Sequence, residues 1–195
     1  YKNNLKTIQN QIKQIENLVN EFSDFARMPK PVFKNNNIIE IVKTNIDLLK
    51  KIDPEIQIKF NLDKHKQLNI FCDYEQISRV LFNLLKNSIE SIHQKVKNTN
   101  NTNKNIDIEI NEISDYITIN LIDNGIGFTN KTAKELVKPY YTTKEKGTGL
   151  GLSIVNKIIN DHNGSIEFLT IKNGAKVKIV LPIEKDVNWN TNNRW

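Results

Sequence analysis

Two prolines, Pro29 and Pro31, divide the chain into parts whose apolar residues repeat with different periods. A helix cannot continue through this pair, because each proline lacks an N–H group and restricts the backbone of the residue before it. Before the prolines, apolar residues recur at spacings of three and four; after them, helical and alternating patterns are mixed. The chain is therefore predicted to consist of an N-terminal helix followed by an α/β domain.

The N-terminal segment carries the a/d pattern of a coiled coil. Its seam, which Leu18 and Phe25 widen, consists of Leu5, Ile8, Ile12, Ile15, Val19, Phe22 and Ala26. The rest of the segment is mostly polar, so the helix has to bury this seam against a partner helix, either from a second copy or from sequence outside the chain. We expect a homodimer through this helix.

The sequence after the prolines predicts a mixed sheet with helices on one face, which is an α/β two-layer sandwich. Helices are expected at 38–52, 73–96 and 150–162, and Asp73 with Gln76 three residues later predicts a capping box. Strands are expected at 56–60, 106–110, 117–121, 165–171 and 175–181, with a hairpin turn over 112–115. A polar tail, 184–195, leaves 32–183 as the folded domain.

The composition excludes several classes of protein. The 28 basic and 22 acidic side chains give a formal net charge of +6, but the lysines are spread among acidic residues, so no nucleic-acid partner is expected. No apolar run approaches the roughly 20 residues that span a bilayer, so this segment is expected to make no membrane contact. Cys72 is the only cysteine, which excludes an internal disulfide and fits the cytoplasm.

Two amides in the segment predicted as a helix at 73–96, Asn83 and Asn87, are four residues apart and therefore share one face. An amide oxygen can ligate a hard cation, and an amide NH2 group can donate to a phosphate oxygen. In a chain rich in Asn, both can equally be ordinary surface residues, and this motif taken alone favours that interpretation.

Residues 123–127 (DNGIG) place an aspartate and two glycines directly after a predicted buried strand. Gly125 and Gly127 allow a sharp turn and a close approach of the backbone to a ligand. The Asp123 carboxylate can accept a hydrogen bond from an exocyclic amine such as that of adenine. The alternative is a plain turn, since Asp-Asn-Gly is a common turn sequence.

Residues 147–152 (GTGLGL) place three alternate glycines at the start of a predicted helix. Their exposed backbone N–H groups and the positive end of the helix favour binding of a polyphosphate. The spacing differs from the dinucleotide fingerprint G-x-G-x-x-G and from the P-loop pattern G-x-x-x-x-G-K-[ST]. A glycine-rich hinge is the alternative, although three alternate glycines exceed what a hinge requires.

The order of these motifs resembles the ATP-binding domain of sensor histidine kinases, within the wider class of gyrase, Hsp90 and MutL ATPases. Residues 83–87 resemble the family's N box, 123–127 its G1 box, 139–144 its F box, 147–152 its G2 box, and 173–182 its closing strand. Residues 22–29 (FSDFARMP) resemble the end of the dimerisation helix in NtrY-like nitrogen-regulation kinases. The resemblance covers nearly the whole chain and implies a Bergerat-type fold preceded by a coiled-coil-like helix.

The resemblance also implies ATP and Mg2+ as ligands and a role for each matching residue. Asn87 would ligate Mg2+, Asn83 would support the phosphates, and Asp123 would bind the adenine amine. Gly125 and Gly127 would shape the adenine pocket. The residues that match the phosphate cradle and the mobile lid are Tyr140, Tyr141, Thr143, Lys144, Gly147, Thr148, Gly149, Leu150 and Gly151.

The chain departs from the family pattern at two points. Many members carry a basic residue three places after the Mg2+ amide, where this chain has Glu90, and Lys86 is the candidate substitute. The family's phosphoacceptor histidine is followed by an acidic residue and then a proline, a context that is absent around His65, His93 and His162. We therefore expect residues 1–28 to be the second helix of the phosphoacceptor hairpin, with the acceptor supplied from outside the chain.

The expected reaction is transfer of the ATP γ-phosphoryl to a histidine, and onward to the receiver domain of a response regulator, by positioning and electrostatics. A hinge at 28–31 would let the ATP domain swing towards that histidine. The expected location is the cytoplasm, with a parent protein that can be anchored in the inner membrane. Three alternatives remain open: a non-kinase ATPase of the same class, which usually has an acidic base in place of Asn83, a non-catalytic dimerisation module, and a nucleic-acid binder with steeply salt-dependent affinity.

Overall fold

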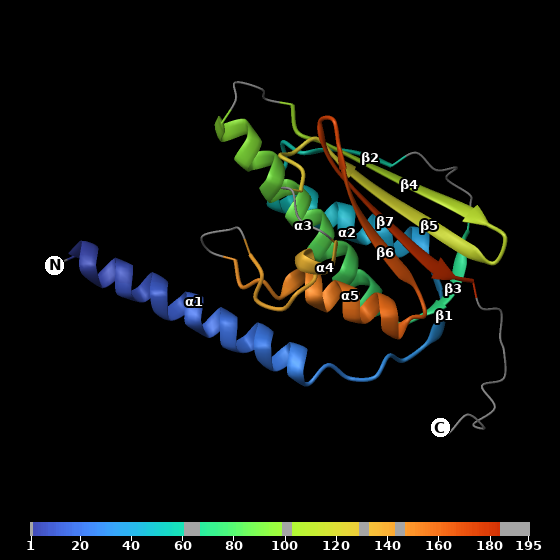
Figure 1. The fold of residues 1–195 in the computed structure, drawn as a ribbon, viewed down its shortest axis with the longest axis horizontal. Helices are drawn as coiled ribbons and strands as arrows, with labels where there is room; N and C mark the ends of the chain where they lie inside the picture. Colours follow the sequence, from blue (N-terminus) through green and yellow to red (C-terminus); the bar gives the residue numbers. More distant parts are fainter. Residues whose placement is uncertain (1, 61–66, 99–102, 129–132, 143–146, 184–195) are drawn as a thin grey trace.

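The computed structural model of the chain describes residues 2–60, 67–98, 103–128, 133–142 and 147–183. His65 and the tail 184–195 lie outside these ranges. Figure 1 shows the elements in the order α1 (Lys2–Ala26), β1 (Lys34–Asn37), α2 (Ile38–Ile52), β2 (Gln57–Phe60), β3 (Asn69–Cys72), α3 (Tyr74–Asn98), β4 (Asn105–Ile113), β5 (Tyr116–Asp123), α4 (Ala133–Leu136), α5 (Gly151–Asp161), β6 (Ser165–Ile171) and β7 (Gly174–Pro182).

The main sheet has the strand order β2-β4-β5-β7-β6. It is mixed, because β2 runs parallel to β4 whereas the other neighbouring strands are antiparallel. Ile119 and Leu121 of β5 are buried in the core, and they pair with Ile179 and Val177 of β7 on the same face. A slip of one residue would turn these side chains to the opposite face, so the apolar alternation fixes the register. The predicted α/β class is confirmed.

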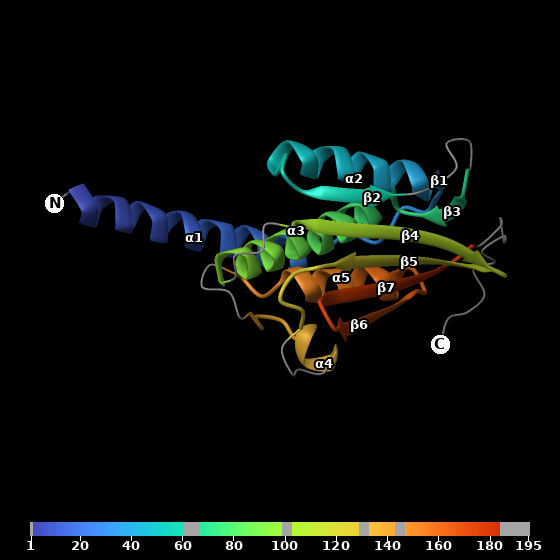
Figure 2. The ribbon, with the colours of Figure 1, turned by 90° about the horizontal axis from the view of Figure 1, so that it is seen from above.

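Helices α2, α3 and α5 pack side by side and supply the rest of the core (Figures 1 and 2). Asn45 of α2 donates to Ser78 Oγ of α3 at 2.9 Å, so a buried amide joins these two helices. Asp73 N, at the start of α3, donates to His162 Nε2, at the end of α5, at 3.0 Å. The two helices therefore run antiparallel, and the first turn of α5 lies beside the middle of α3.

The start of α3 is capped as predicted, but only in part. Asp73 Oδ1 accepts from Gln76 N at 3.0 Å, which is the N-cap bond of a capping box. The Gln76 side chain, however, donates to Pro29 O at 3.0 Å, and Asp73 N donates to His162. The predicted capping box is half correct, because tertiary contacts take both groups of the second bond.

Two local features differ from the sequence prediction. Strands β1 and β3 form a separate antiparallel sheet that was not expected, because the sequence of β1 (KNNN) has no apolar alternation. Asn36 Nδ2 donates to Cys72 O at 2.8 Å and strengthens this pairing. The β4–β5 turn is shorter than predicted, because pairing continues to Ile113 and Tyr116. The turn consists only of 114–115, with φ 54° at Ser114.

The N-terminal part of helix α1 extends beyond the sheet and the helix layer (Figures 1 and 2), whereas near its C-terminal end Phe22 stacks on Tyr140. Its apolar seam is open, with 48–61 % exposure of the residues Leu5, Ile8, Ile12, Ile15, Val19 and Phe22. A contiguous exposed apolar stripe of this kind marks an interaction surface. None of the helices in the described part of the chain combines the length and the hydropathy that crossing a bilayer requires.

Candidate functional site

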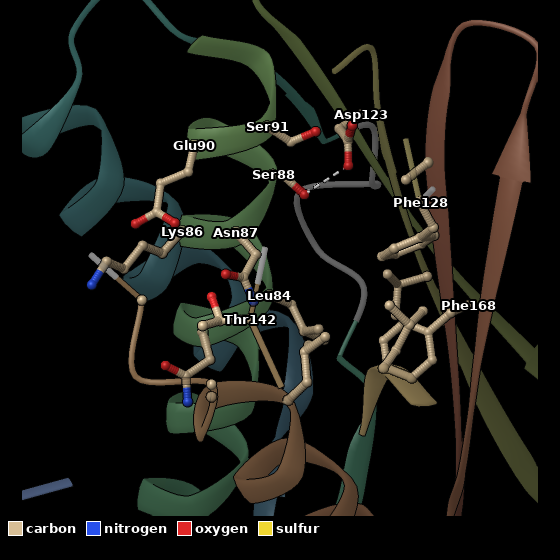
Figure 3. Close-up of a pocket in the computed structure, with 18 of the residues that line it drawn as sticks. Leu84, Lys86, Asn87, Ser88, Glu90, Ser91, Asp123, Phe128, Thr142 and Phe168 are labelled. Carbon is tan, nitrogen blue, oxygen red and sulfur yellow. Dashed lines mark hydrogen bonds between the residues drawn. The ribbon is translucent and has the colours of Figure 1, made fainter. Parts of the chain in front are cut away.

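A cavity of about 500 Å3 lies between α3, the loop after β5, and the start of α5. This volume is within the range of small-molecule sites, about 300–1,000 Å3. Leu84, Asn87 and Ser91 of α3 line one side, and Phe168 of β6 and Val177 of β7 line another. Figure 3 shows Phe128 and Phe168 on the side of the cavity opposite Leu84. The walls therefore combine apolar surface with a few polar groups.

Asp123, the last residue of β5, is the buried carboxylate of the cavity, with 5 % exposure. Its Oδ2 accepts from Ser88 Oγ at 3.0 Å, the bond drawn in Figure 3, and its Oδ1 accepts from Gly125 N at 2.9 Å. Burial raises the pKa of this carboxyl above its ordinary value, although the hydrogen bonds from Gly125 and Ser88 act in the opposite direction. Each carboxylate oxygen retains acceptor capacity, so Asp123 can receive an N–H donor from a ligand.

The loop after Asp123 is fixed to α3 at two points. Ser91 Oγ accepts from Ile126 N at 3.0 Å, and Lys95 Nζ donates to Asn124 O at 2.8 Å. A Cβ at Gly125 would overlap both the side chain and the backbone of Ser91, so glycine is needed for this close approach. The loop is held against α3, which sets the position of Asp123 relative to that helix.

Gly127 and Phe128, at the end of this loop, lie against β6 and the start of β7. Gly127 has φ 76°, a conformation that glycine adopts readily, and a Cβ there would lie 2.8 Å from Gly174 O. Phe128 packs edge-on against Phe168 with ring centroids 5.5 Å apart, and its carbonyl accepts from Thr170 Oγ1 at 3.0 Å. Both rings line the cavity, so this wall can cover a flat apolar group.

The glycine-rich segment reaches the cavity at the start of α5. Gly149 has φ 72°, and a Cβ there would lie 2.7 Å from Tyr141 N, so glycine is required where the two segments cross. Leu150 occupies the N-cap position of α5 without a hydrogen bond from its side chain, which cannot provide one. Gly151 begins the helix. In the first turn of a helix the backbone N–H groups lack intrahelical partners and form the positive end of the helix dipole, which suits a phosphate.

Two amides and two cationic side chains of α3 also border the cavity: Asn83, Asn87, Arg79 and Lys86. Asn83 and Asn87 lie one turn apart on the same wall, as their spacing predicts. The Asn87 amide oxygen is a suitable ligand for a hard cation. Glu90, one turn further along α3, adds a negative charge to the same border. The cavity thus has a carboxylate, amides and cations arranged along one helix.

Most of the sequence-predicted site residues lie around this one cavity: Asn83, Lys86, Asn87, Asp123, Gly127, Tyr141, Gly147, Thr148, Gly149 and Gly151. Gly125 instead packs behind the loop against Ser91. Leu150 is fully buried in the core, because its apolar side chain points away from the cavity. Thr143 and Lys144 lie outside the described residues.

Sequence reasoning missed Ser88, Ser91, Arg79, Phe128 and Phe168. The signal for Ser88 was a hydroxyl within the apolar stripe of α3, where a buried polar group needs a partner. Arg79 is one turn before Asn83, so the sequence spacing could also have placed it on the same face of α3. The two phenylalanines are brought together only by the sheet, since they are distant in the chain.

Known proteins resemble this chain in sequence over most of its length. The family model described as histidine kinase-, DNA gyrase B-, and HSP90-like ATPase matches residues 72–185. The nitrogen regulation protein NtrY of Azorhizobium caulinodans is 35 % identical over 180 residues, which are 92 % of this chain and 23 % of that protein. Sporulation kinase E of Bacillus subtilis is 32 % identical over 182 residues, which are 92 % of this chain and 24 % of that protein. The chain spans about a quarter of the length of these two relatives.

Solved structures share the fold. The catalytic domain of histidine kinase ThkA has a TM-score of 0.68 and 27 % identity, over 78 % of this chain and 96 % of that one. ThkA in complex with the response regulator TrrA has a TM-score of 0.72 and 24 % identity, over 91 % of this chain and 50 % of that one. The second likeness, because of its lower identity, concerns the fold alone.

Proposed function

This chain belongs to the histidine kinase-, DNA gyrase B-, and HSP90-like ATPase family, and on that premise we propose that it is the ATP-binding catalytic domain of a sensor histidine kinase. The observation that carries the proposal is Asp123, a buried carboxylate that Ser88 and Gly125 hold at the border of a ligand-sized cavity. In this assignment residues 32–183 form the ATP-binding domain, 1–28 the second helix of the dimerisation hairpin, and 184–195 a polar tail.

The adenine base binds at Asp123, whose carboxylate accepts a hydrogen bond from the exocyclic amine. Leu84, Phe128 and Phe168 supply apolar surface for the two faces of the ring. Gly125 and Gly127 shape this end through the loop that they form. The burial of Asp123 supports this role, since a hydrogen bond to a charged acceptor is stronger away from water.

The phosphates bind at the start of α5, where the backbone N–H groups of the glycine-rich segment lie at the positive end of the helix. Asn83 and Lys86 of α3 assist there, and Tyr141, Thr143 and Lys144 belong to the lid. Mg2+ fits beside them, because the Asn87 amide oxygen borders the same cavity. Asn87 would hold the Mg2+ through its amide oxygen, and the ion would supply positive charge that offsets the charge of the phosphates.

The reaction transfers the γ-phosphoryl group to a histidine nitrogen: the bond to the β-phosphate oxygen breaks, a P–N bond forms, and ADP leaves. His93 and His162 do not line the cavity, and both make internal bonds, at 2.7 Å to Asp53 and at 2.8 Å to Ile158 O. For the two histidines that the structure describes, this supports an acceptor supplied from outside the chain; His65 lies outside the described residues. The phosphoryl group then passes to the receiver domain of a response regulator, a partner class suggested by the complex of ThkA with TrrA.

The exposed seam of α1 supports a homodimer, in which two copies bury these side chains in a helical bundle. The domain acts in the cytoplasm, as part of a parent protein that can be anchored in the inner membrane. Buried Cys72 is free, which agrees with a reducing compartment.

The test is the affinity for Mg-ATP, measured by isothermal titration calorimetry. Asp123→Asn replaces one acceptor oxygen with an NH2 group that faces the adenine amine, so we expect affinity to fall roughly 10- to 100-fold. Asp115→Asn, in the exposed β4–β5 turn, is the matched control and should bind like the wild type. Thermal unfolding of each variant checks that the fold is retained, and an unchanged affinity in folded Asp123→Asn would reject the adenine assignment.

A further inference from the structure

The segment that joins α1 to the α/β domain is bonded to the start of α3. Asp73 Oδ2 accepts from Val32 N at 2.7 Å, while its Oδ1 caps α3 by accepting from Gln76 N at 3.0 Å. One carboxylate therefore serves two segments that are far apart in the sequence. Because the acceptor is charged, the bond to Val32 N is of the stronger class of hydrogen bonds.

A second contact holds the same segment at its first proline. Gln76 Nε2 donates to Pro29 O at 3.0 Å. Gln76 is buried, with 8 % exposure, and its Oε1 has no hydrogen-bond partner within the described residues. A buried amide with one unsatisfied oxygen is unfavourable by itself. Because the other polar atom of this side chain has no partner within the described residues, the bond to Pro29 O accounts for its orientation.

His162 holds the backbone of Asp73 and also contacts the linker, residues 29–33, which joins α1 to the α/β domain. Its Nε2 accepts from Asp73 N at 3.0 Å, and its Nδ1 donates to Ile158 O at 2.8 Å, which defines the tautomer. The ring of Phe33 packs on the imidazole with centroids 5.0 Å apart. Phe33 also stacks on Phe71 of β3, with ring centroids 5.7 Å apart. The linker is therefore held by polar contacts at 29 and 32 and by an aromatic contact at 33.

We propose that Asp73, Gln76 and His162 form a clasp that docks residues 29–33 onto the α/β domain. Because Met28 also packs against the core of this domain, the pivot between the domain and α1 is confined to the backbone at Arg27. Arg27 N still bonds to Ser23 O at 2.9 Å, in continuation of α1. The prolines then move with the domain rather than acting as its hinge. This differs from the sequence-based expectation of a hinge across 28–31.

The docking of residues 29–33 is argued from contacts alone. The role of this docking in catalysis rests on the proposed function. A short pivot restricts the directions in which the ATP domain can turn relative to α1. A phosphoryl transfer that requires the domain to approach a histidine on a neighbouring helix depends on such a restriction, because misplacement of reacting groups lowers the rate. Loss of the clasp would leave the nucleotide cavity intact, since none of the three clasp residues lines it.

The first test uses hydrogen exchange in the 195-residue chain. Asp73→Asn keeps one carbonyl oxygen for the N-cap bond to Gln76 N, because Asn is a good N-cap residue, but loses the second acceptor. We expect the Val32 amide, protected in the wild type, to exchange roughly tenfold faster or more in this variant. Glu75→Gln removes an exposed charge from the same turn of α3 and should leave Val32 unchanged.

The second test measures the spread of distances between α1 and the sheet by pulsed electron resonance, with spin labels on cysteines introduced at Lys13 and Glu112. Burial raises the pKa of Cys72 to about 12, so this thiol does not compete for the label. Asp73→Asn and Gln76→Ala should each broaden the distance distribution, and Glu75→Gln should not.

Two results would overturn the clasp: exchange of Val32 in the wild type at the rate of an unfolded peptide, or a distance distribution that both variants leave unchanged. Mg-ATP affinity is measured on the same proteins. If the wild type and the clasp variants bind Mg-ATP equally while the distances broaden, both proposals stand. If no protein binds Mg-ATP but the distances still broaden, the proposed function fails and the clasp remains.

Discussion

Single residues in this chain owe their properties to the packing around them. In the sequence Asp123 begins a turn motif and is a candidate acceptor for an exocyclic amine. In the fold it is a buried carboxylate, and burial raises its pKa. His162 stands at the end of a predicted helix, but in the fold it is buried and bonded through both nitrogens. In both residues burial disfavours the charged form.

We expect His162 to make the stability of the domain depend on pH. Burial lowers its pKa, although the bond to Ile158 O and the nearby charges of Asp73 and Asp161 oppose this. The unfolded chain, with a pKa of about 6.5, therefore binds the proton more tightly than the folded one. This contribution is complete above pH 6.5 and is lost as the pH falls below it, by at most about 1.4 kcal/mol per pH unit.

Urea unfolding between pH 8 and pH 5 measures this effect. We expect the free energy of unfolding of the wild type to decrease towards pH 5, and His162→Gln, which cannot take up a proton, to show a smaller decrease. The difference between the two proteins isolates the contribution of His162 from those of the other ionisable groups. Parallel curves would show that the folded state does not disfavour the charged imidazole.

At the scale of elements, the start of α5 depends on one glycine. Gly149 has φ 72° and lies against the backbone of Tyr140 and Tyr141. Gly151, only two residues later, has nothing within 4 Å of the position that a Cβ would take. The two glycines look equivalent in the sequence, but packing separates them.

Alanine substitutions test this difference. Gly149→Ala should lower the free energy of unfolding by about 1–2 kcal/mol or more, because the left-handed conformation and the overlap with Tyr141 both oppose a Cβ. Gly151→Ala should be neutral or stabilising by up to about 1 kcal/mol, because alanine is favoured in a helix. Chemical unfolding of the two variants gives both values, and equal destabilisation would contradict the packing argument.

At the scale of the whole molecule, α1 carries the surface through which we expect two copies to associate. Its seam is about half exposed in the single chain, whereas a stable helix of this kind buries its seam against a partner. α1 also contacts the α/β domain directly, since the Phe22 and Tyr140 rings stack with centroids 6.5 Å apart. A partner helix on the seam would therefore adjoin the segment that crosses Gly149.

Analytical ultracentrifugation over a range of concentrations tests the dimer. Ile12→Asp places a charge in the middle of the seam and should shift the protein to the monomer by at least tenfold in the dissociation constant, since an unpaired charge in an interface is costly. Lys13→Asp is the control, because it introduces the same side chain on the neighbouring polar face, outside the seam. A wild type that sediments as a monomer at high concentration would exclude this surface as a dimer contact.

The sequence alone determined the elements with strong apolar periodicity and the turns that glycines mark at 123–127 and 147–152. Alternating β5 and β7 and the apolar stripe of α3 depend on local pattern, which the chain displays directly. The polar strand β1 could not be predicted in this way, because its pairing with β3 depends on a partner far along the chain. The second bond of the capping box could not be predicted either, because the Gln76 side chain bonds to Pro29 O and Asp73 N bonds to His162.

Tertiary structure decided which of the marked residues share one cavity. The stripe of Asn83 and Asn87 is a property of one helix, so the sequence was sufficient to place it. The sequence could not show that Phe128 and Phe168 face each other, that Ser88 supports Asp123, or that the prolines are docked. These are contacts between distant segments, which arise only when burial of the common core fixes the register of the sheet and the packing of the helices.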